Sequence, residues 1–216
     1  MDSHSTLLFG GTFNPIHFGH LLLATYAQEQ MPDCDEVVFI PSGDHPHKKD
    51  ILPFKDRHWM TVLATNERKS FTVSVVEDEL DGPSYTINTI RHLAQTRPDN
   101  KLYWLIGPDN LKDLRNWYKI DELVEECNFV LAIHENERIW YHPHRHPKNM
   151  WYRSPDFVDH PFYEKMAQNM VIVGIPNIEI RSTTIRERVK QEKPITFMTT
   201  ASVRTNILIN GFYKDK

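Results

Sequence analysis

The sequence predicts an α/β protein with a doubly wound parallel sheet, helices on both faces and a helical C-terminal part. Short apolar runs alternate along the chain with segments of helical composition, which is typical of repeated βαβ units. The first run, residues 6–9, ends at Gly10-Gly11 directly before a helical segment, the order expected of a buried strand and its following helix. The chain has 216 residues, a length that fits one domain with a full core or one domain plus a subdomain, and we expect a single domain over residues 1–216.

The individual elements follow from the hydrophobic pattern and its breakers. Strands are expected at residues 6–9, 36–41, 71–80, 101–107, 128–134, 170–176 and 178–180. Helices are expected at residues 19–31, 54–68, 85–97, 110–117, 120–127, 184–192 and 201–210. Ser84 or Thr86 is placed to cap the helix at 85–97, and Thr184 with Glu187 has the spacing of a capping box.

The composition argues against several classes of protein. A net charge of -4 and a pI near 6.3 are unlike a chain whose whole surface binds nucleic acid or an anionic membrane. Cys34 and Cys127 lie far apart and in no CxxC pattern, so neither a disulfide framework nor a thiolate metal site is expected. The first residues lack the pattern of a signal peptide, and no apolar run is long enough to span a bilayer. We therefore expect a cytoplasmic protein with no nucleic-acid or membrane partner.

Residues 8–24 place two histidines at the start of the helix that follows Gly10-Gly11. Glycines at the carboxyl end of a strand let the backbone approach a ligand closely, and a helix N-terminus attracts anions. The spacing fits neither the G-x-G-x-x-G nor the Walker pattern. His17 and His20 lie three residues apart, so both rings are expected to face one pocket. Imidazolium donors there would suit an anion that gains charge during a reaction.

A structural role is the alternative for these histidines. One would cap the helix while the other is buried and hydrogen-bonded, which is the favoured interpretation for a single histidine. The pair behind Gly-Gly and Pro15 favours a ligand site instead. A zinc site is less favoured because no third ligand is placed nearby. We therefore assign no metal-ligating residue.

The stretch His17-Phe18-Gly19-His20, preceded by Gly-Gly-Thr-Phe-Asn-Pro-Ile, resembles the [T/H]-x-G-H nucleotidyltransferase superfamily. The resemblance implies a Rossmann-like fold in which both histidines bind the nucleotide phosphates. It also implies that they stabilise the transition state of adenylyl or cytidylyl transfer. The implied phosphate contacts of the preceding loop come from Gly10, Gly11, Thr12 and Phe13.

Four further stretches resemble bacterial nicotinate mononucleotide adenylyltransferases: residues 41–49, 82–90, 105–119 and 180–189. The resemblance implies that Lys48 and Arg186 join the histidines as catalytic residues and hold the triphosphate. Further ATP contacts are implied for Gly107, Asp109, Ser182 and Thr183. Contacts to the acceptor are implied for His47, Thr86, Trp117 and Tyr118. His45 and Arg181 depart from the family's pattern.

The implied reaction moves AMP from ATP to nicotinate mononucleotide and gives deamido-NAD and pyrophosphate, with Mg²⁺ carried by ATP. The acceptor phosphate is already an anion, so positioning and charge neutralisation are expected to supply the catalysis. Nicotinamide mononucleotide, phosphopantetheine and a cytidylyl acceptor remain alternative substrates. A nucleotide sensor without turnover is a further alternative, which the presence of His17, His20, Lys48 and Arg186 disfavours.

Residues 135–165 lie outside this resemblance and form an irregular insert rich in His, Pro, Trp and Tyr. His142, His144 and His146 alternate, so an extended chain would put them on one side. A metal site, a surface or lid loop, and a subunit contact in a homo-oligomer are the alternatives. The prolines among these histidines favour a loop over a metal site.

Overall fold

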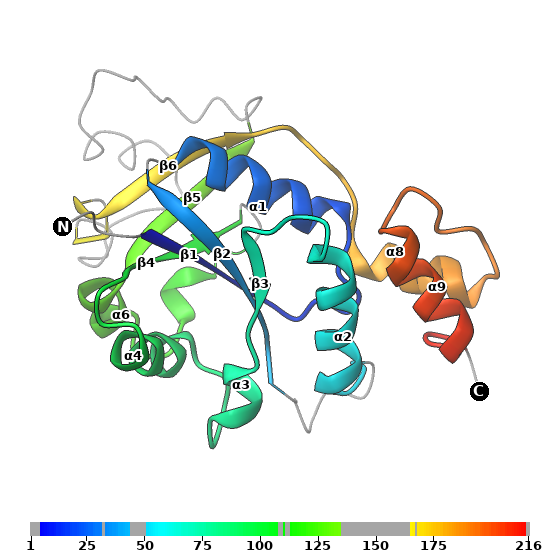
Figure 1. Cartoon of the computed structure of the whole chain (residues 1–216), viewed down its shortest axis with the longest axis horizontal. Coiled ribbons are helices and arrows are strands. Elements are labelled where there is room, and N and C mark those ends of the chain that lie inside the picture. The colour runs from blue at the N-terminus through cyan, green and yellow to red at the C-terminus, as the bar shows by residue number, and fades with distance from the viewer. Residues whose placement is uncertain are drawn as a thin grey trace. The chain divides into compact units, whose positions relative to one another are not determined.

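The computed structural model describes residues 5–31, 33–43, 51–107, 110, 113–134, 165–166 and 168–214. Its strands form a six-stranded sheet in the order β3-β2-β1-β4-β5-β6 (Figure 1). The strands are β1 (Ser5–Gly11), β2 (Cys34–Pro41), β3 (Phe71–Val73), β4 (Lys101–Ile106), β5 (Asn128–His134) and β6 (Met170–Ile175). Pairing is parallel between β1 and β4, β2 and β3, β4 and β5, and β5 and β6. The order runs outward from β1 in both directions, which is the doubly wound arrangement and confirms the predicted fold class.

Helices alternate with these strands along the chain. They are α1 (Phe18–Gln30), α2 (Phe54–Thr65), α3 (Val76–Glu79), α4 (Thr86–Thr96), α6 (Ile120–Glu126), α8 (Ser182–Lys190) and α9 (Ala201–Asn210), with a short 3-10 turn, η1 (Leu114–Asn116). In α4 the buried Ile87, Ile90 and Leu93 recur every third residue, so one stripe of the helix is apolar. The two helices after β6 confirm the predicted helical C-terminal part.

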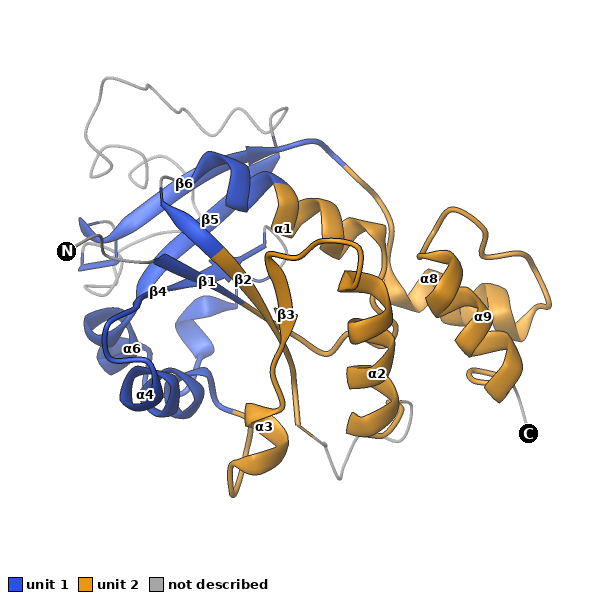
Figure 2. Cartoon of the chain, in the orientation of Figure 1, with its two compact units in different colours: residues 1–8, 26–35, 85–177 blue, residues 9–25, 36–84, 178–216 orange. Residues whose placement is uncertain are grey.

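The described chain packs as two compact units (Figure 2). Unit 1 comprises residues 1–8, 26–35 and 85–177, and its core includes Leu8, Trp104 and Phe129. Unit 2 comprises residues 9–25, 36–84 and 178–216, and its core includes Phe13, Phe39, Met60, Ile185 and Ile207. A single domain over residues 1–216 stays a prediction.

The region predicted as a strand over residues 71–80 is a strand only at its start. β3 ends at Val73, and α3 begins at Val76. The Ser74 hydroxyl accepts a hydrogen bond from the Val76 backbone N–H at 3.2 Å, which favours a turn over continued pairing. Three acidic residues in the first turn of α3 then suit the positive end of a helix. The strand predicted at residues 178–180 is likewise wrong, since these residues have no strand structure.

Both predicted helix caps are wrong. α8 begins at Ser182 with Arg181 as its N-cap, so Thr184 lies inside the helix and no side chain caps its start. The reason lies in Ser182, whose hydroxyl donates to the Pro15 carbonyl at 2.8 Å and fixes an earlier start. α4 has Tyr85 as its N-cap without a side-chain bond. Ser84 instead accepts the Gly43 backbone N–H at 3.0 Å.

Three expectations from the sequence fall on residues that the structure does not describe. The histidine- and aromatic-rich insert at 135–165 lies outside the described residues except for Lys165 at its end. His47 and Lys48 lie outside them as well, and so does Asp109.

In the described part of the chain, no helix has the length and apolar character that crossing a membrane requires.

Candidate functional site

The loop after β1 is tightly folded around an aromatic cluster in unit 2. A Cβ at Gly11 would lie 2.8 Å from the Phe13 ring, so only glycine fits there without displacing that ring. Phe13 itself has a positive φ of 46°, which is uncommon for a bulky residue. Its ring packs against Phe9 and Phe39, with centroids 5.5 and 5.8 Å away. Packing therefore holds the loop backbone in a conformation that it would not adopt alone.

Asn14 and its neighbours collect hydrogen bonds from distant parts of unit 2. The Asn14 carbonyl accepts from Arg186 Nη1 at 2.8 Å, and its side-chain Oδ1 accepts from the Tyr213 hydroxyl at 2.9 Å. The next carbonyl, of Pro15, accepts from Ser182 at the start of α8. The start of α8 is thus fixed beside the loop that precedes the two histidines. The phosphate contacts implied for Ser182 and Arg186 stay a prediction.

His17 and His20 lie together at the start of α1. Their rings stack with centroids 3.7 Å apart and planes 22° from parallel. The Nδ1 atom of His20 accepts the His17 backbone N–H at 3.2 Å. Gly19 makes this geometry accessible, because a Cβ there would lie 3.0 Å from the His17 ring. The two rings lie together as their spacing predicted, while their facing a ligand pocket stays a prediction. His20 also serves the capping role that the structural alternative proposed.

Both imidazoles are neutral at pH 7 in the ligand-free protein. Burial lowers the pKa of His17 to about 4. The pKa of His20 lies well below its ordinary value, first because of burial and then because of the charge that His17 would carry. The expectation of imidazolium donors concerns the anion-bound protein and stays a prediction. Since Nδ1 of His20 accepts a hydrogen bond, its proton is assigned to Nε2, which leaves a neutral N–H donor.

The start of α8 offers fewer donors than the sequence indicated. The Ser182 hydroxyl proton is used on Pro15, so that hydroxyl can only accept from a further group in this arrangement. Thr183 is exposed in the first turn. Arg186 lies one turn further and carries five N–H donors, so its bond to Asn14 does not exhaust the guanidinium. The backbone N–H groups of the first turn remain suited to an anion.

Unit 1 carries three of the residues implied for the acceptor, and His47 belongs to unit 2. Thr86 is the first residue of α4, and Trp117 and Tyr118 lie between η1 and α6. The Tyr118 ring is 48% exposed and stacks on the Tyr85 ring with centroids 4.3 Å apart. Trp117 is partly exposed, although a tryptophan would be expected in the core from its residue type alone. Gly107 is buried at the end of β4.

Tyr85 is a candidate site residue that the sequence motifs did not indicate. The sequence does contain an indication of this role. Tyr85 directly precedes the start of a helix and is adjacent to Thr86, which is implied to bind the acceptor. The tyrosine pair offers a flat apolar face of the kind on which an aromatic ring stacks.

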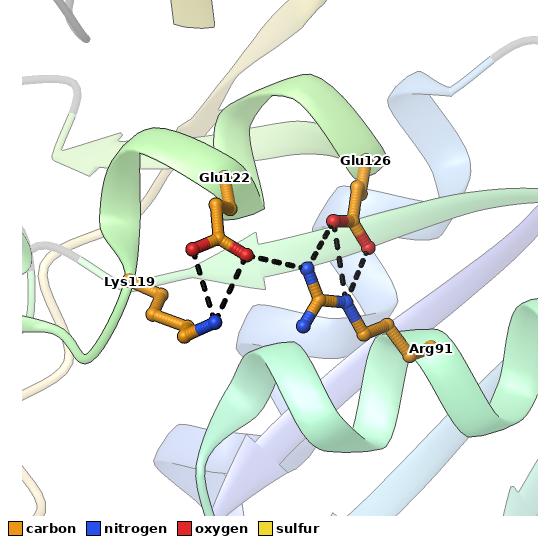
Figure 3. Close-up of polar contacts among 4 residues, drawn as sticks. All are labelled: Arg91, Lys119, Glu122 and Glu126. Carbon is orange, nitrogen blue, oxygen red and sulfur yellow. Dashed lines mark hydrogen bonds and ion pairs between the residues drawn. The ribbon is translucent and has the colours of Figure 1, made fainter.

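A surface ion-pair network joins the two helices that follow Tyr85 and Tyr118 (Figure 3). Arg91 of α4 donates from Nη2 to Glu122 Oε2 at 2.6 Å and from Nε to Glu126 Oε2 at 2.9 Å. Both glutamates lie on α6. Lys119 contacts Glu122 at 3.1 Å. The hydrogen bonds that Arg91 donates to Glu126 and Glu122 raise its pKa, and the same bonds lower the pKa of both carboxyls. The four side chains are partly exposed, so salt will weaken the network.

A family model decides what this chain is related to. The model described as cytidylyltransferase-like matches residues 8–188, a range that contains the Gly-Gly loop, both histidines and Arg186. The chain belongs to the cytidylyltransferase-like family. A relative from Caldicellulosiruptor saccharolyticus, named "Probable nicotinate-nucleotide adenylyltransferase", is 32% identical over 96% of this chain and 98% of its own length. A relative of the same name from Desulfitobacterium hafniense is 31% identical over 96% of this chain and 94% of its own length.

Solved structures of other proteins have a similar fold. A nicotinic acid mononucleotide adenylyltransferase from Plasmodium falciparum, solved with NaAD, matches with a TM-score of 0.73 at 16% identity. It covers 97% of each chain, and the same protein solved with APC gives a TM-score of 0.72. The match spans nearly all of both chains, which confirms the fold class. The resemblance drawn from the motifs is confirmed by the family model and the named relatives together.

Proposed function

We propose that this cytidylyltransferase-like protein transfers AMP from ATP to nicotinate mononucleotide, releasing pyrophosphate and forming deamido-NAD. The observation that carries the proposal is the stacked pair of His17 and His20 at the glycine-rich end of β1. The full-length similarity to chains named nicotinate-nucleotide adenylyltransferase supports the choice of acceptor. The reaction belongs to NAD synthesis, and we expect the enzyme to work in the cytoplasm.

The chemistry requires positioning and charge stabilisation more than proton transfer. An oxygen of the mononucleotide phosphate attacks the α-phosphorus of ATP, and the bond to the β-phosphate oxygen breaks as pyrophosphate leaves. The attacking phosphate is an anion, so no general base has to deprotonate it. Preorganised donors near the α- and β-phosphates then supply most of the stabilisation.

Unit 2 supplies most of the groups proposed to bind ATP, and unit 1 supplies Gly107 and Asp109. His17 and His20 contact the α- and β-phosphates, with the His20 Nε2–H as a fixed donor. The anionic phosphates would raise the pKa of His17, so binding favours its protonated form, while His20 Nδ1 keeps accepting the His17 N–H. Arg186 and Lys48 hold the triphosphate, and Mg²⁺ arrives as part of the ATP complex. The remaining proposed ATP contacts are Gly10, Gly11, Thr12, Phe13, Gly107, Asp109, Ser182 and Thr183.

Unit 1 supplies most of the groups proposed to bind the acceptor. Trp117 offers a partly exposed aromatic side chain to the electron-poor pyridine ring, and the Thr86 and Tyr118 backbones are proposed to bind its carboxylate. His47 is proposed to contact the acceptor as well. A carboxylate on the ring is the feature that separates nicotinate from nicotinamide mononucleotide, so these contacts set the choice between them.

Pyrophosphate release by the purified protein with ATP and Mg²⁺ tests the proposal. Nicotinate mononucleotide, nicotinamide mononucleotide and phosphopantetheine are compared as acceptors at equal concentration. The proposal predicts release with nicotinate mononucleotide well above the other two. Preference for another acceptor would overturn the acceptor assignment. Release with none of them would contradict the proposed activity and favour a nucleotide sensor.

A further inference from the structure

Arg57 is a fully buried arginine on α2 whose guanidinium donates to three backbone carbonyls. Its exposed fraction is 0%. Nε donates to the Leu52 carbonyl at 2.7 Å, Nη1 to the Thr12 carbonyl at 2.9 Å and Nη2 to the Gly43 carbonyl at 3.3 Å. The guanidinium carbon also lies 5.9 Å from the centre of the Phe54 ring. Each nitrogen of the side chain therefore has a fixed direction.

The three carbonyls belong to three separate segments of unit 2. Thr12 lies in the loop after β1, between the glycine pair and Asn14. Gly43 follows β2, and Leu52 precedes α2, so these two residues flank the segment 44–50 on either side. One side chain thus fixes both flanks of that segment relative to the loop that leads to the histidine pair.

Gly43 and Leu52 are also fixed through their own N–H groups. The Gly43 N–H donates to the Ser84 hydroxyl at 3.0 Å, and a Cβ at this position would lie 2.5 Å from the Glu77 carbonyl. The Leu52 N–H donates to Asn14 Oδ1 at 3.3 Å. Arg57 therefore adds a carbonyl contact to residues whose N–H groups are already bound. The result is a continuous set of hydrogen bonds from Asn14 through Leu52 and Arg57 to Thr12.

Arginine has a chemical advantage at this position. A guanidinium presents planar donors in several directions at once, whereas a lysine ammonium is a compact charge on a flexible stem. Burying a charge is expensive unless hydrogen bonds compensate for it. A hydrophobic side chain would fill the same core space at lower cost but would leave the three carbonyls unbound. The arginine is therefore better explained by the geometry that it imposes than by stability.

We propose that Arg57 is a positioning residue for adenylyl transfer, which fixes the Thr12 backbone against Gly43 and Leu52 so that the loop after β1 is ready to receive the triphosphate. The inference rests on the proposed function for its kinetic effect. It does not make Arg57 a catalytic residue, because the side chain contacts protein carbonyls. Its loss should weaken ATP use and leave the acceptor contacts of unit 1 unchanged.

Two substitutions and a matched control test this role. Arg57→Met removes all three bonds, and Arg57→Lys keeps the charge with a single donor group. Thr61→Val is the control, because Thr61 is equally buried one turn along α2 and its hydroxyl donates to the Arg57 backbone carbonyl, away from the loops. We expect Arg57→Met to raise KM for ATP about tenfold or more, Arg57→Lys to recover part of the loss, and Thr61→Val to stay within about twofold.

Amide hydrogen exchange gives a readout independent of turnover. Exchange at the Leu52 and Gly43 N–H groups should be faster in Arg57→Lys than in the wild type and the Thr61→Val control. If Arg57→Met does not fold, Arg57→Lys carries the comparison. Equal exchange and an unchanged KM for ATP in Arg57→Lys would overturn the proposal. If the wild type releases no pyrophosphate with any acceptor, the proposed function fails, while exchange and the Kd for ATP still report on Arg57.

Discussion

The stacked imidazoles of His17 and His20 lie 3.7 Å apart, and the second accepts the backbone N–H of the first. Two imidazolium ions this close would repel each other strongly, so the ligand-free pair stays neutral. A bound polyphosphate would raise the pKa of His17 by supplying negative charge beside it. The pair is therefore a place where anion binding and protonation are coupled, and its neutral state has consequences for stability.

Acid should destabilise the free protein through His17. Its pKa is about 4 in the folded protein and about 6.5 in the unfolded chain, so the unfolded chain binds more protons between these values. Stability is therefore lost as the pH falls from about 6.5 to about 4, by roughly 3 kcal/mol from this group alone. Thermal unfolding between pH 4 and 8 should show a shallower decline for His17→Asn than for the wild type. Parallel curves for the two proteins would argue against a neutral buried His17.

Replacing His20 should remove most of the activity while leaving a folded protein. We expect His20→Ala to lower kcat by about 10²–10³, the usual effect of losing one donor to a developing negative charge. The His20 ring also packs on Phe13, with centroids 5.0 Å apart, so His20→Asn is the gentler second variant. His92→Ala on α4 controls for loss of a histidine elsewhere. Near-normal turnover of both His20 variants, measured as pyrophosphate release, would remove this residue from the mechanism.

Tyr213→Phe should weaken ATP binding without touching a phosphate contact. Burial raises the pKa of Tyr213, so its hydroxyl remains a donor to Asn14 at working pH. Asn14 in turn binds Arg186, so loss of the hydroxyl loosens the guanidinium proposed to hold the triphosphate. We expect a rise of about three- to tenfold in KM for ATP and a stability loss of about 1 kcal/mol. Tyr103→Phe on β4 is the matched control. Equal KM values for ATP in the two variants would exclude an effect of Tyr213 on ATP binding through Asn14 and Arg186.

Tyr118→Ala should affect the acceptor and not ATP. The substitution removes the ring that stacks on Tyr85 in unit 1. Aromatic pairs of this kind contribute about 0.5–1.5 kcal/mol, so we expect KM for nicotinate mononucleotide to rise up to about tenfold. KM for ATP should stay constant, and Tyr118→Phe should behave as the wild type because it keeps the stack. An equal change in both KM values would contradict the division of roles between the two units.

The sequence predicted those features that depend on local pattern or on a motif. The apolar run before Gly10-Gly11 marked β1, and the three-residue spacing of His17 and His20 brought their rings together. The prediction of a strand over residues 71–80 was wrong beyond Val73, because it relied on the high strand propensity of Val73, Val75 and Val76. Ser74 and the acidic run instead form a turn and a short helix.

The remaining features depend on contacts between segments far apart in the chain. Arg57 lies in an ordinary amphipathic helical segment, and its partner Thr12 is 45 residues away. Backbone carbonyls leave no pattern in a sequence, so this role could not be predicted. The neutral state of His17 depends on how deeply its ring is buried, which only the packing of unit 2 determines.

Label transfer from ATP carrying a radioactive α-phosphate tests the central claim most directly. The purified protein is incubated with labelled ATP, Mg²⁺ and nicotinate mononucleotide, and the products are separated. The account predicts that the label moves into the dinucleotide, that the pyrophosphate carries none, and that His20→Ala abolishes most of the transfer. Label remaining in ATP, or appearing as free AMP without dinucleotide, would contradict adenylyl transfer to this acceptor.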